Sequence, residues 1–188
     1  MTPDLQHEYQ LLRDVAMEQL KAIPESGNFR HVFSIWMMPS FSPPSRCTVY
    51  SPLPRAKEKQ PFADFTVWRS ELDGEKLRSP TERLKHPKDL IPTIENEVVW
   101  LTADEVKQME QTIQGISIPL YLGQGSVAGC DGTSFEFRYD EIFFGGSIHW
   151  WENFPTEWRP FTEAVVRIAT ALRERAKRMA RSDDSSGQ

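Results

Sequence analysis

The sequence predicts a single α+β domain over residues 1–181, in which a mainly antiparallel sheet carries helices on one side. The 188 residues suit one domain, and 39% hydrophobic with 11% aromatic residues is enough for a packed core. Most strand candidates follow one another through turns, which favours antiparallel pairing over regular βαβ units. Strong helical periodicity occurs in N-terminal, central and long C-terminal segments, so we expect these helices to pack on the sheet.

The first part of the chain predicts one helix and three strands. Residues 3–22 form an amphipathic helix, because apolar side chains recur there at helical spacing behind a proline. The apolar run Phe29–Met38 lacks this spacing and predicts a central strand. A proline-rich loop follows around a short strand at Arg46–Tyr50. Residues 62–72 predict the next strand, which we expect an Asp73-Gly74 turn to close.

The middle of the chain contains two capping boxes. The first, Ser79–Glu82, predicts a short surface helix. Residues 94–101 alternate in polarity and predict a strand with one partly solvated face. The second box, Thr102–Glu105, begins the central helix, and we expect Gly115 to end it in a left-handed conformation. A further short strand is predicted at Ile116–Leu122.

The C-terminal part predicts a hairpin followed by a long helix. Aromatic residues alternate with polar ones over Phe135–Tyr139, and Ile142–Trp150 continues the same apolar face on an antiparallel partner. Pro155 opens a helix whose apolar stripe should cover that face, namely Trp158, Phe161, Val165, Ile168 and Leu172. The polar tail 182–188 is expected to be disordered.

Charge and cysteine usage exclude several classes of protein. A net charge of −5 argues against nucleic-acid binding, which needs a basic surface. The chain lacks both an apolar stretch of membrane-spanning length and a signal-peptide pattern, so we expect a cytoplasmic protein without a membrane partner. Cys47 and Cys130 show neither zinc-site nor disulfide-framework spacing. We therefore expect no metal site from the sequence pattern, and a metal site assembled from distant segments stays open.

Two segments could carry chemistry, but each has a simpler structural interpretation. Leu122–Ala128 matches the G-x-G-x-x-A form of a dinucleotide site, yet the Gly129–Gly132 run that follows breaks the helix such a site requires. Cys130, Asp131 and His149 could supply a nucleophile, an acid and a base. Turn chemistry at Asp131 and burial of the cysteine explain the same residues. We therefore predict no catalytic residues and no cofactor.

The segment His149–Trp158 is the most unusual in the chain. Strand alternation sends Trp150 and Trp151 to opposite faces, so if Trp150 enters the core Trp151 points outward. An outward tryptophan is a favoured anchor in protein interfaces. The alternative is that the last helix or the proline-rich loop covers it. Glu152 follows directly and Glu136 lies on the outward face of the paired strand, so we predict a partner-binding site of Trp151, Glu152 and Glu136.

Residues 129–172, GCDGTSFEFRYDEIFFGGSIHWWENFPTEWRPFTEAVVRIATAL, resemble the C-terminal part of a loose group of uncharacterised small bacterial proteins. The shared pattern is DGT before an aromatic-alternating strand, a second strand ending in WW, and P-x-x-W opening a long helix. Proteins of this appearance include immunity proteins, which bind and block a bacterial toxin. The resemblance implies a protein partner, and the acidic surface suits a basic toxin.

The sequence thus favours a non-catalytic protein-binding role, with toxin neutralisation as its specific form. Two other classes stay open. One is an enzyme whose polar site is assembled from distant segments, and the other is a homodimeric structural protein.

Overall fold

The structure is a computed structural model that describes residues 3–22, 27–40, 42–57, 60–79, 91–119, 132–140, 145–152 and 154–185. Its strands are β1 (Phe29–Pro39), β2 (Ser45–Pro52), β3 (Phe62–Trp68), β4 (Ile94–Trp100), β5 (Thr133–Asp140) and β6 (Gly145–Trp151). Its helices are α1 (Pro3–Lys21), α2 (Ser70–Arg78), α4 (Ala103–Gln114) and α5 (Arg159–Ser185), with a 3₁₀ turn, η2 (Thr156–Trp158), before α5.

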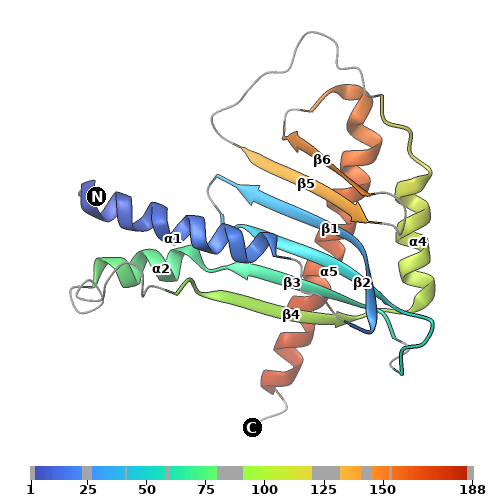
Figure 1. The fold of residues 1–188 in the computed structure, drawn as a ribbon, viewed down its shortest axis with the longest axis horizontal. Helices are drawn as coiled ribbons and strands as arrows, with labels where there is room; N and C mark the ends of the chain where they lie inside the picture. Colours follow the sequence, from blue (N-terminus) through green and yellow to red (C-terminus); the bar gives the residue numbers. More distant parts are fainter. Residues whose placement is uncertain are drawn as a thin grey trace.

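The strands form one six-stranded sheet in the order β4-β3-β2-β1-β5-β6 (Figure 1). Every neighbouring pair in this sheet is antiparallel. β1 pairs with both β2 and β5, which confirms the central position predicted from its apolar side chains. The protein is therefore the expected single α+β domain.

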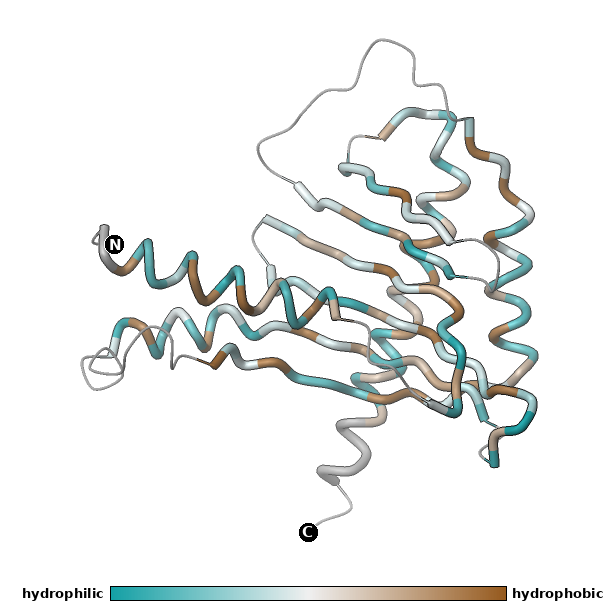
Figure 2. Tube along the Cα trace, in the orientation of Figure 1, coloured by the Kyte–Doolittle hydropathy of each residue, from teal (hydrophilic) through white to brown (hydrophobic). Residues whose placement is uncertain are grey.

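The main core lies between one face of the sheet and the helices α4 and α5. Figure 2 shows the apolar stretches of the strands and of α5 that contribute to it. The predicted aromatic face is confirmed for the described residues Phe135, Phe137, Tyr139, Ile148 and Trp150, which pack with Phe161, Val165, Ile168 and Leu172 of α5. Ile142 and Phe144, which were predicted to join this face, lie outside the described residues.

The other face of the sheet carries α1 and α2, so the prediction that all helices lie on one side is wrong. Trp68 of β3 points to this second face and is buried against Ala16 and Leu20 of α1. The order of strands in the sequence predicts their pairing, but it does not say which face each flanking helix covers. No helix in the described ranges combines the length and the apolar composition that crossing a bilayer requires.

Arg46 of β2 fixes the end of α1 to the sheet. Its guanidinium is buried and donates hydrogen bonds to the carbonyl oxygens of Leu20, at 2.8 Å, and of Ala22. The same group donates to Thr66 Oγ1 at 2.9 Å and pairs with Asp64 Oδ2 at 3.0 Å. A cation that binds the last carbonyls satisfies acceptors that a helix end leaves unpaired. The contact therefore sets where α1 crosses the second face.

The segment after β3 is a helix, whereas the sequence suggested that the strand extends to Leu72 and ends in an Asp73-Gly74 turn. Asp73 is fully buried, and its Oδ2 accepts hydrogen bonds from Trp68 Nε1 and from the Thr93 backbone N–H, both at 2.8 Å. Its Oδ1 accepts from the Thr93 hydroxyl and from Lys76 Nζ. These contacts select the helix over the local turn preference of Asp-Gly.

Three smaller predictions are also corrected. Gly115 was predicted to be left-handed but has a right-handed conformation with φ −72°. The helical turn continues through it, since the Gly115 N–H donates to the Gln111 carbonyl. Residues 116–119 are not a strand, and α5 continues to Ser185, past the expected start of the tail. The short helix predicted after Ser79 and the glycine-rich segment Leu122–Ala128 lie outside the described residues.

Candidate functional site

Trp150 and Trp151 point to opposite faces of β6, as alternation predicts. Trp150 is buried in the main core, where its ring stacks on that of Phe135 with centroids 5.4 Å apart. Trp151 is half-buried on the second face, opposite Ser134 of β5. A tryptophan at the end of an edge strand, on the face that carries α1 and α2, is thus available to form part of a surface site.

Trp151 lines a groove of about 1050 Å³ on this second face. The groove is bounded by α1, α2, the loop between β1 and β2, and the end of β6. We call it the tryptophan groove, and its defining residues are Tyr9, Met17, Met38, Trp68, Gly74 and Trp151. The charged residues that line it carry both signs: Arg13, Arg78, Glu71 and Glu75. The proline-rich loop therefore forms one wall of a recess beside Trp151.

Gly132 lies beside Trp151 and Glu152, where a side chain would not fit without a shift of its neighbours. Its φ of +145° is a conformation that residues with a side chain rarely adopt. A Cβ at this position would lie 3.1 Å from the Trp151 ring and 2.9 Å from Glu152 Oε2. Glu152 Oε2 also accepts a hydrogen bond from the Thr133 backbone N–H at 2.9 Å. A side chain at position 132 would therefore collide with Trp151 and Glu152, and the hydrogen bond holds Glu152 against the start of β5.

The three residues predicted to bind a partner have different environments. Trp151 lines the groove, and Glu152 is exposed next to it. Glu136 points to the same face but is only 8% exposed, so the expectation that it lies on the surface is wrong. Its carboxylate lies 3.4 Å from His149 Nδ1, and burial raises its pKa despite the opposing charges of His149, Lys21 and Arg138. Alternation indicates which face a residue is on, but not what covers that face.

A histidine, a serine and an aspartate meet on the same face, an arrangement that the sequence analysis missed. His31 Nε2 lies 2.8 Å from Ser34 Oγ, and His31 Nδ1 lies 3.3 Å from Asp140 Oδ2. A bulge in β1 between His31 and Phe33 changes the alternation, and the sequence gives no sign of it.

This trio resembles the serine, histidine and acid of a hydrolase in its contacts only. Ser34 is fully buried, and its hydroxyl also hydrogen-bonds with that of Thr48 at 3.0 Å. Burial lowers the pKa of His31, although Asp140 opposes the shift. A nucleophile must reach its substrate, so we interpret the trio as a partly buried polar contact between β1, β2 and β5.

The other groups considered for catalysis offer no assembled centre within the described residues. His149 pairs with Glu136, while Cys130 and Asp131 lie outside the described ranges. Cys47 is fully buried, and burial raises the pKa of its thiol to about 12, which keeps it protonated. No cluster of three or more metal-ligating side chains occurs in the part of the chain that the structure describes.

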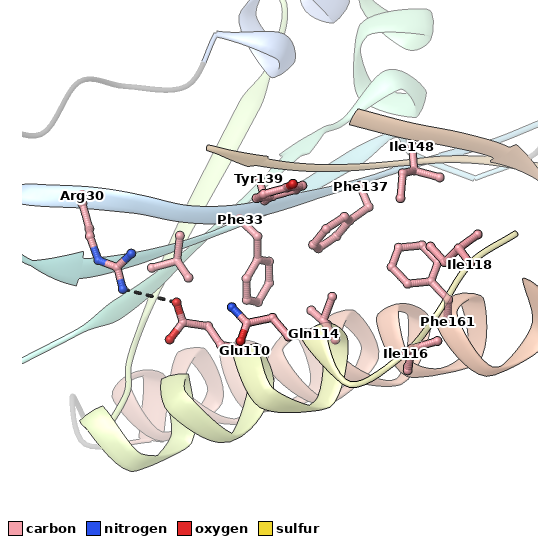
Figure 3. A pocket seen from close by; sticks show the side chains of 12 residues that line it. Arg30, Phe33, Glu110, Gln114, Ile116, Ile118, Phe137, Tyr139, Ile148 and Phe161 are labelled. Carbon is pink, nitrogen blue, oxygen red and sulfur yellow. Dashed lines mark hydrogen bonds and ion pairs between the residues drawn. The ribbon is translucent and has the colours of Figure 1, made fainter. Parts of the chain in front are cut away.

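A second recess, an apolar cavity of about 410 Å³, lies in the main core between the sheet and α4 (Figure 3). Its walls include Val32, Phe33, Ile113, Phe137, Ile148 and Phe161. Arg30, Glu110 and Gln114 lie at its polar end, where Arg30 Nη2 is 3.2 Å from Glu110 Oε1. The sequence analysis missed this cavity, because its walls come from segments that meet only in the folded chain.

Comparisons of the chain with protein-family models, with curated proteins and with solved structures find no match.

Proposed function

We propose that the protein is a non-catalytic binding protein that holds a segment of a protein partner in the tryptophan groove. The observation that carries this proposal is the position of Trp151, whose half-buried ring forms part of the wall of a recess of about 1050 Å³. Neutralisation of a bacterial toxin is the specific role that the C-terminal resemblance suggests.

The residue types in the groove support a protein as the ligand. Tryptophan, tyrosine, methionine and arginine are enriched at the centre of protein interfaces, whereas lysine is depleted. Tyr9, Met17 and Arg13 of α1 face the groove together with Met38 of β1 and Trp151 of β6. Methionine side chains adapt to the shape of a bound surface, while tryptophan contributes a large contact area with few rotatable bonds.

The groove is also built to keep its shape. Asp73 fixes α2 against β3, and Glu152, next to Trp151, is held at the start of β5 by the Thr133 N–H. Pro39, Pro43 and Pro44 restrict the loop that forms the opposite wall. A wall that is already ordered loses little conformational freedom when a partner binds, so more of the contact energy is available for affinity.

The net charge of the chain favours a basic partner, while the groove itself is lined by two arginines and two glutamates. The chain has a net charge of −5, and Glu152 lies exposed at the end of β6 beside the groove. Charges around an interface mainly accelerate association and exclude partners of the wrong sign. Trp151 is therefore assigned as the anchor and Glu152 as a rim residue that guides a basic surface to it.

The experiment compares partner capture by the wild type with capture by Trp151→Ala and Trp100→Ala. Trp100 is the matched control, because it is 45% exposed on β4, outside the groove. A captured protein is then purified and titrated calorimetrically. Losing an interface anchor costs at least about 2 kcal/mol, so Trp151→Ala should weaken binding by about 30-fold or more. Trp100→Ala should bind like the wild type.

A second variant blocks the groove without removing a contact. Gly74 lies in α2, and a Cβ added there meets no atom within 4 Å. Gly74→Trp therefore places an indole beside the groove, and replacing a helical glycine should not destabilise α2. Weakened binding by both groove variants supports the proposal. Unchanged binding by both, with circular dichroism showing folded protein, would refute it.

For the toxin role, co-expression should restore growth of cells that produce the captured toxin, and Trp151→Ala should not.

A further inference from the structure

We propose that the apolar cavity binds a neutral amphiphile, a small molecule with an apolar chain or ring and an uncharged hydrogen-bonding head. The cavity lies on the α4 and α5 face of the sheet, whereas the tryptophan groove lies on the α1 and α2 face. This binding site is therefore separate from the protein-binding role proposed above.

The interior of the cavity suits an apolar group. Side chains from β1, β5, β6, α4 and α5 converge on it (Figure 3). Phe33, Phe137 and Phe161 present aromatic surfaces, and Phe137 and Phe161 meet edge to face with centroids 5.5 Å apart. Small-molecule sites have volumes of about 300–1,000 Å³ and are mostly apolar with a few placed polar groups. The cavity of about 410 Å³ meets both criteria.

The polar end of the cavity selects against a charged head. Arg30 and Glu110 form an ion pair there, so each charge already has a counter-charge. Their side chains are 46% and 25% exposed. A ligand carboxylate would compete with Glu110 for Arg30, and a ligand ammonium would compete with Arg30 for Glu110. Either competition gives up the existing ion pair, which an uncharged head leaves intact; because Arg30 is exposed, this pair is worth at most about 1 kcal/mol, or about fivefold in affinity. A hydroxyl or amide head can instead hydrogen-bond with the intact pair or with Gln114.

The wall formed by α4 is held in position independently of any ligand. The capping box at Thr102 and Glu105 fixes the start of this helix. Glu105 Oε1 also pairs with Arg175 Nη1 of α5 at 2.7 Å. Val106 is buried in the core, whereas Ile113, the penultimate residue of the helix, lines the cavity. The cavity is therefore pre-formed, which lowers the entropic cost of binding.

The test uses the neutral fluorophore N-phenyl-1-naphthylamine as the probe, with purified full-length protein. Its emission should rise saturably as it enters the cavity. Competitors of equal chain length, 1-decanol, decanoate and decylammonium, are then added below their aggregation concentrations. The wild type should release the probe at a decanol concentration up to about fivefold lower than that of either charged competitor.

Glu110→Gln provides the decisive comparison, because it leaves Arg30 without its carboxylate. Decanoate should then displace the probe up to about fivefold better than it does from the wild type. Glu95→Gln is the matched control. Glu95 is on β4, away from the cavity, and its Oε2 lies 2.8 Å from Arg69 Nη1. The variant therefore removes a carboxylate from a comparable ion pair. That variant should keep the wild-type order of competitors.

Two further variants locate the probe. Ile113→Trp should fill the cavity and reduce probe affinity by about tenfold, while Trp151→Ala should leave it unchanged. Wild type that binds no probe, or charged and neutral competitors that act equally, would overturn the proposal. Loss of probe binding in Trp151→Ala would place the probe in the groove instead. If Ile113→Trp does not fold, the competitor order in the wild type and in Glu110→Gln still decides the question.

Discussion

Replacing Asp73 by alanine should loosen α2 and destabilise the whole domain. The buried carboxylate accepts hydrogen bonds at 2.8 Å from Trp68 Nε1 and from the Thr93 backbone N–H. Without it, the buried Trp68 donor and the partly buried Thr93 donor lose that acceptor, at a cost of up to about 3 kcal/mol each. Removing the carboxylate also removes the cost of its own burial, so we expect a net loss of about 3 kcal/mol. Asp73→Asn keeps one acceptor oxygen, so its free energy of unfolding should lie between that of the wild type and that of Asp73→Ala.

Urea unfolding followed by circular dichroism measures this effect. With an m value of about 2 kcal/mol per molar, the Asp73→Ala midpoint should fall by about 1–2 M. Glu71→Gln is the control, because Glu71 is an exposed acid on the same helix and pairs with Arg69 at the surface. Its midpoint should stay close to that of the wild type. An Asp73→Ala midpoint equal to that of Glu71→Gln would refute the assignment of Asp73 as the anchor of α2.

Three further predictions concern the core and the buried titratable groups. Phe137→Ala and Ile168→Ala should each lower the free energy of unfolding by about 2–5 kcal/mol, and near wild-type urea midpoints for both would contradict the core. Burial raises the pKa of Glu136, so the folded state binds its proton more tightly than the unfolded chain, and stability falls as pH rises above about 4.5. The stability of Glu136→Gln minus that of the wild type should therefore increase from about pH 4 to pH 7. Melts in which this difference does not change with pH would contradict the shift. Burial lowers the pKa of His31, so the folded state loses stability as pH falls below 6.5, and His31→Gln should lose less than the wild type between about pH 7 and pH 5. Parallel pH profiles for His31→Gln and the wild type would contradict this.

Features set by neighbouring residues could be predicted from the sequence. The Thr102 and Glu105 capping box forms as expected, because both of its hydrogen bonds join residues three apart. The alternation of Phe135, Phe137 and Tyr139 likewise predicts which side chains face α5. Both signals depend only on backbone periodicity and local hydrogen bonding.

Features set by distant segments could not be predicted in this way. Asp73-Gly74 has the local signal of a turn, but hydrogen bonds from Trp68 and Thr93 make Asp73 part of a helix. Helix α1 is held on the second face of the sheet by the hydrogen bond from Arg46 to the Leu20 carbonyl, and these two residues lie 26 positions apart in the chain. No short sequence pattern contains both Asp73 and Thr93, or both Arg46 and Leu20.

The same distinction between neighbouring residues and distant segments applies to the candidate site. Trp151 could be identified because Trp150 and Trp151 are adjacent and must alternate. The burial of Glu136 and the groove beside Trp151 depend on α1, α2 and the loop between β1 and β2, so they needed the structure.

Site-specific photo-crosslinking tests the central claim, that the tryptophan groove holds a protein partner, most directly. The photoreactive residue p-benzoylphenylalanine replaces either Met38, which lines the groove, or Val98, which is exposed on β4 outside it. Irradiation of each variant with the captured partner is followed by mass spectrometry of the linked peptides. The account predicts that position 38 crosslinks to one segment of the partner and that position 98 does not. Crosslinking from position 98 alone would place the interface elsewhere and contradict the account.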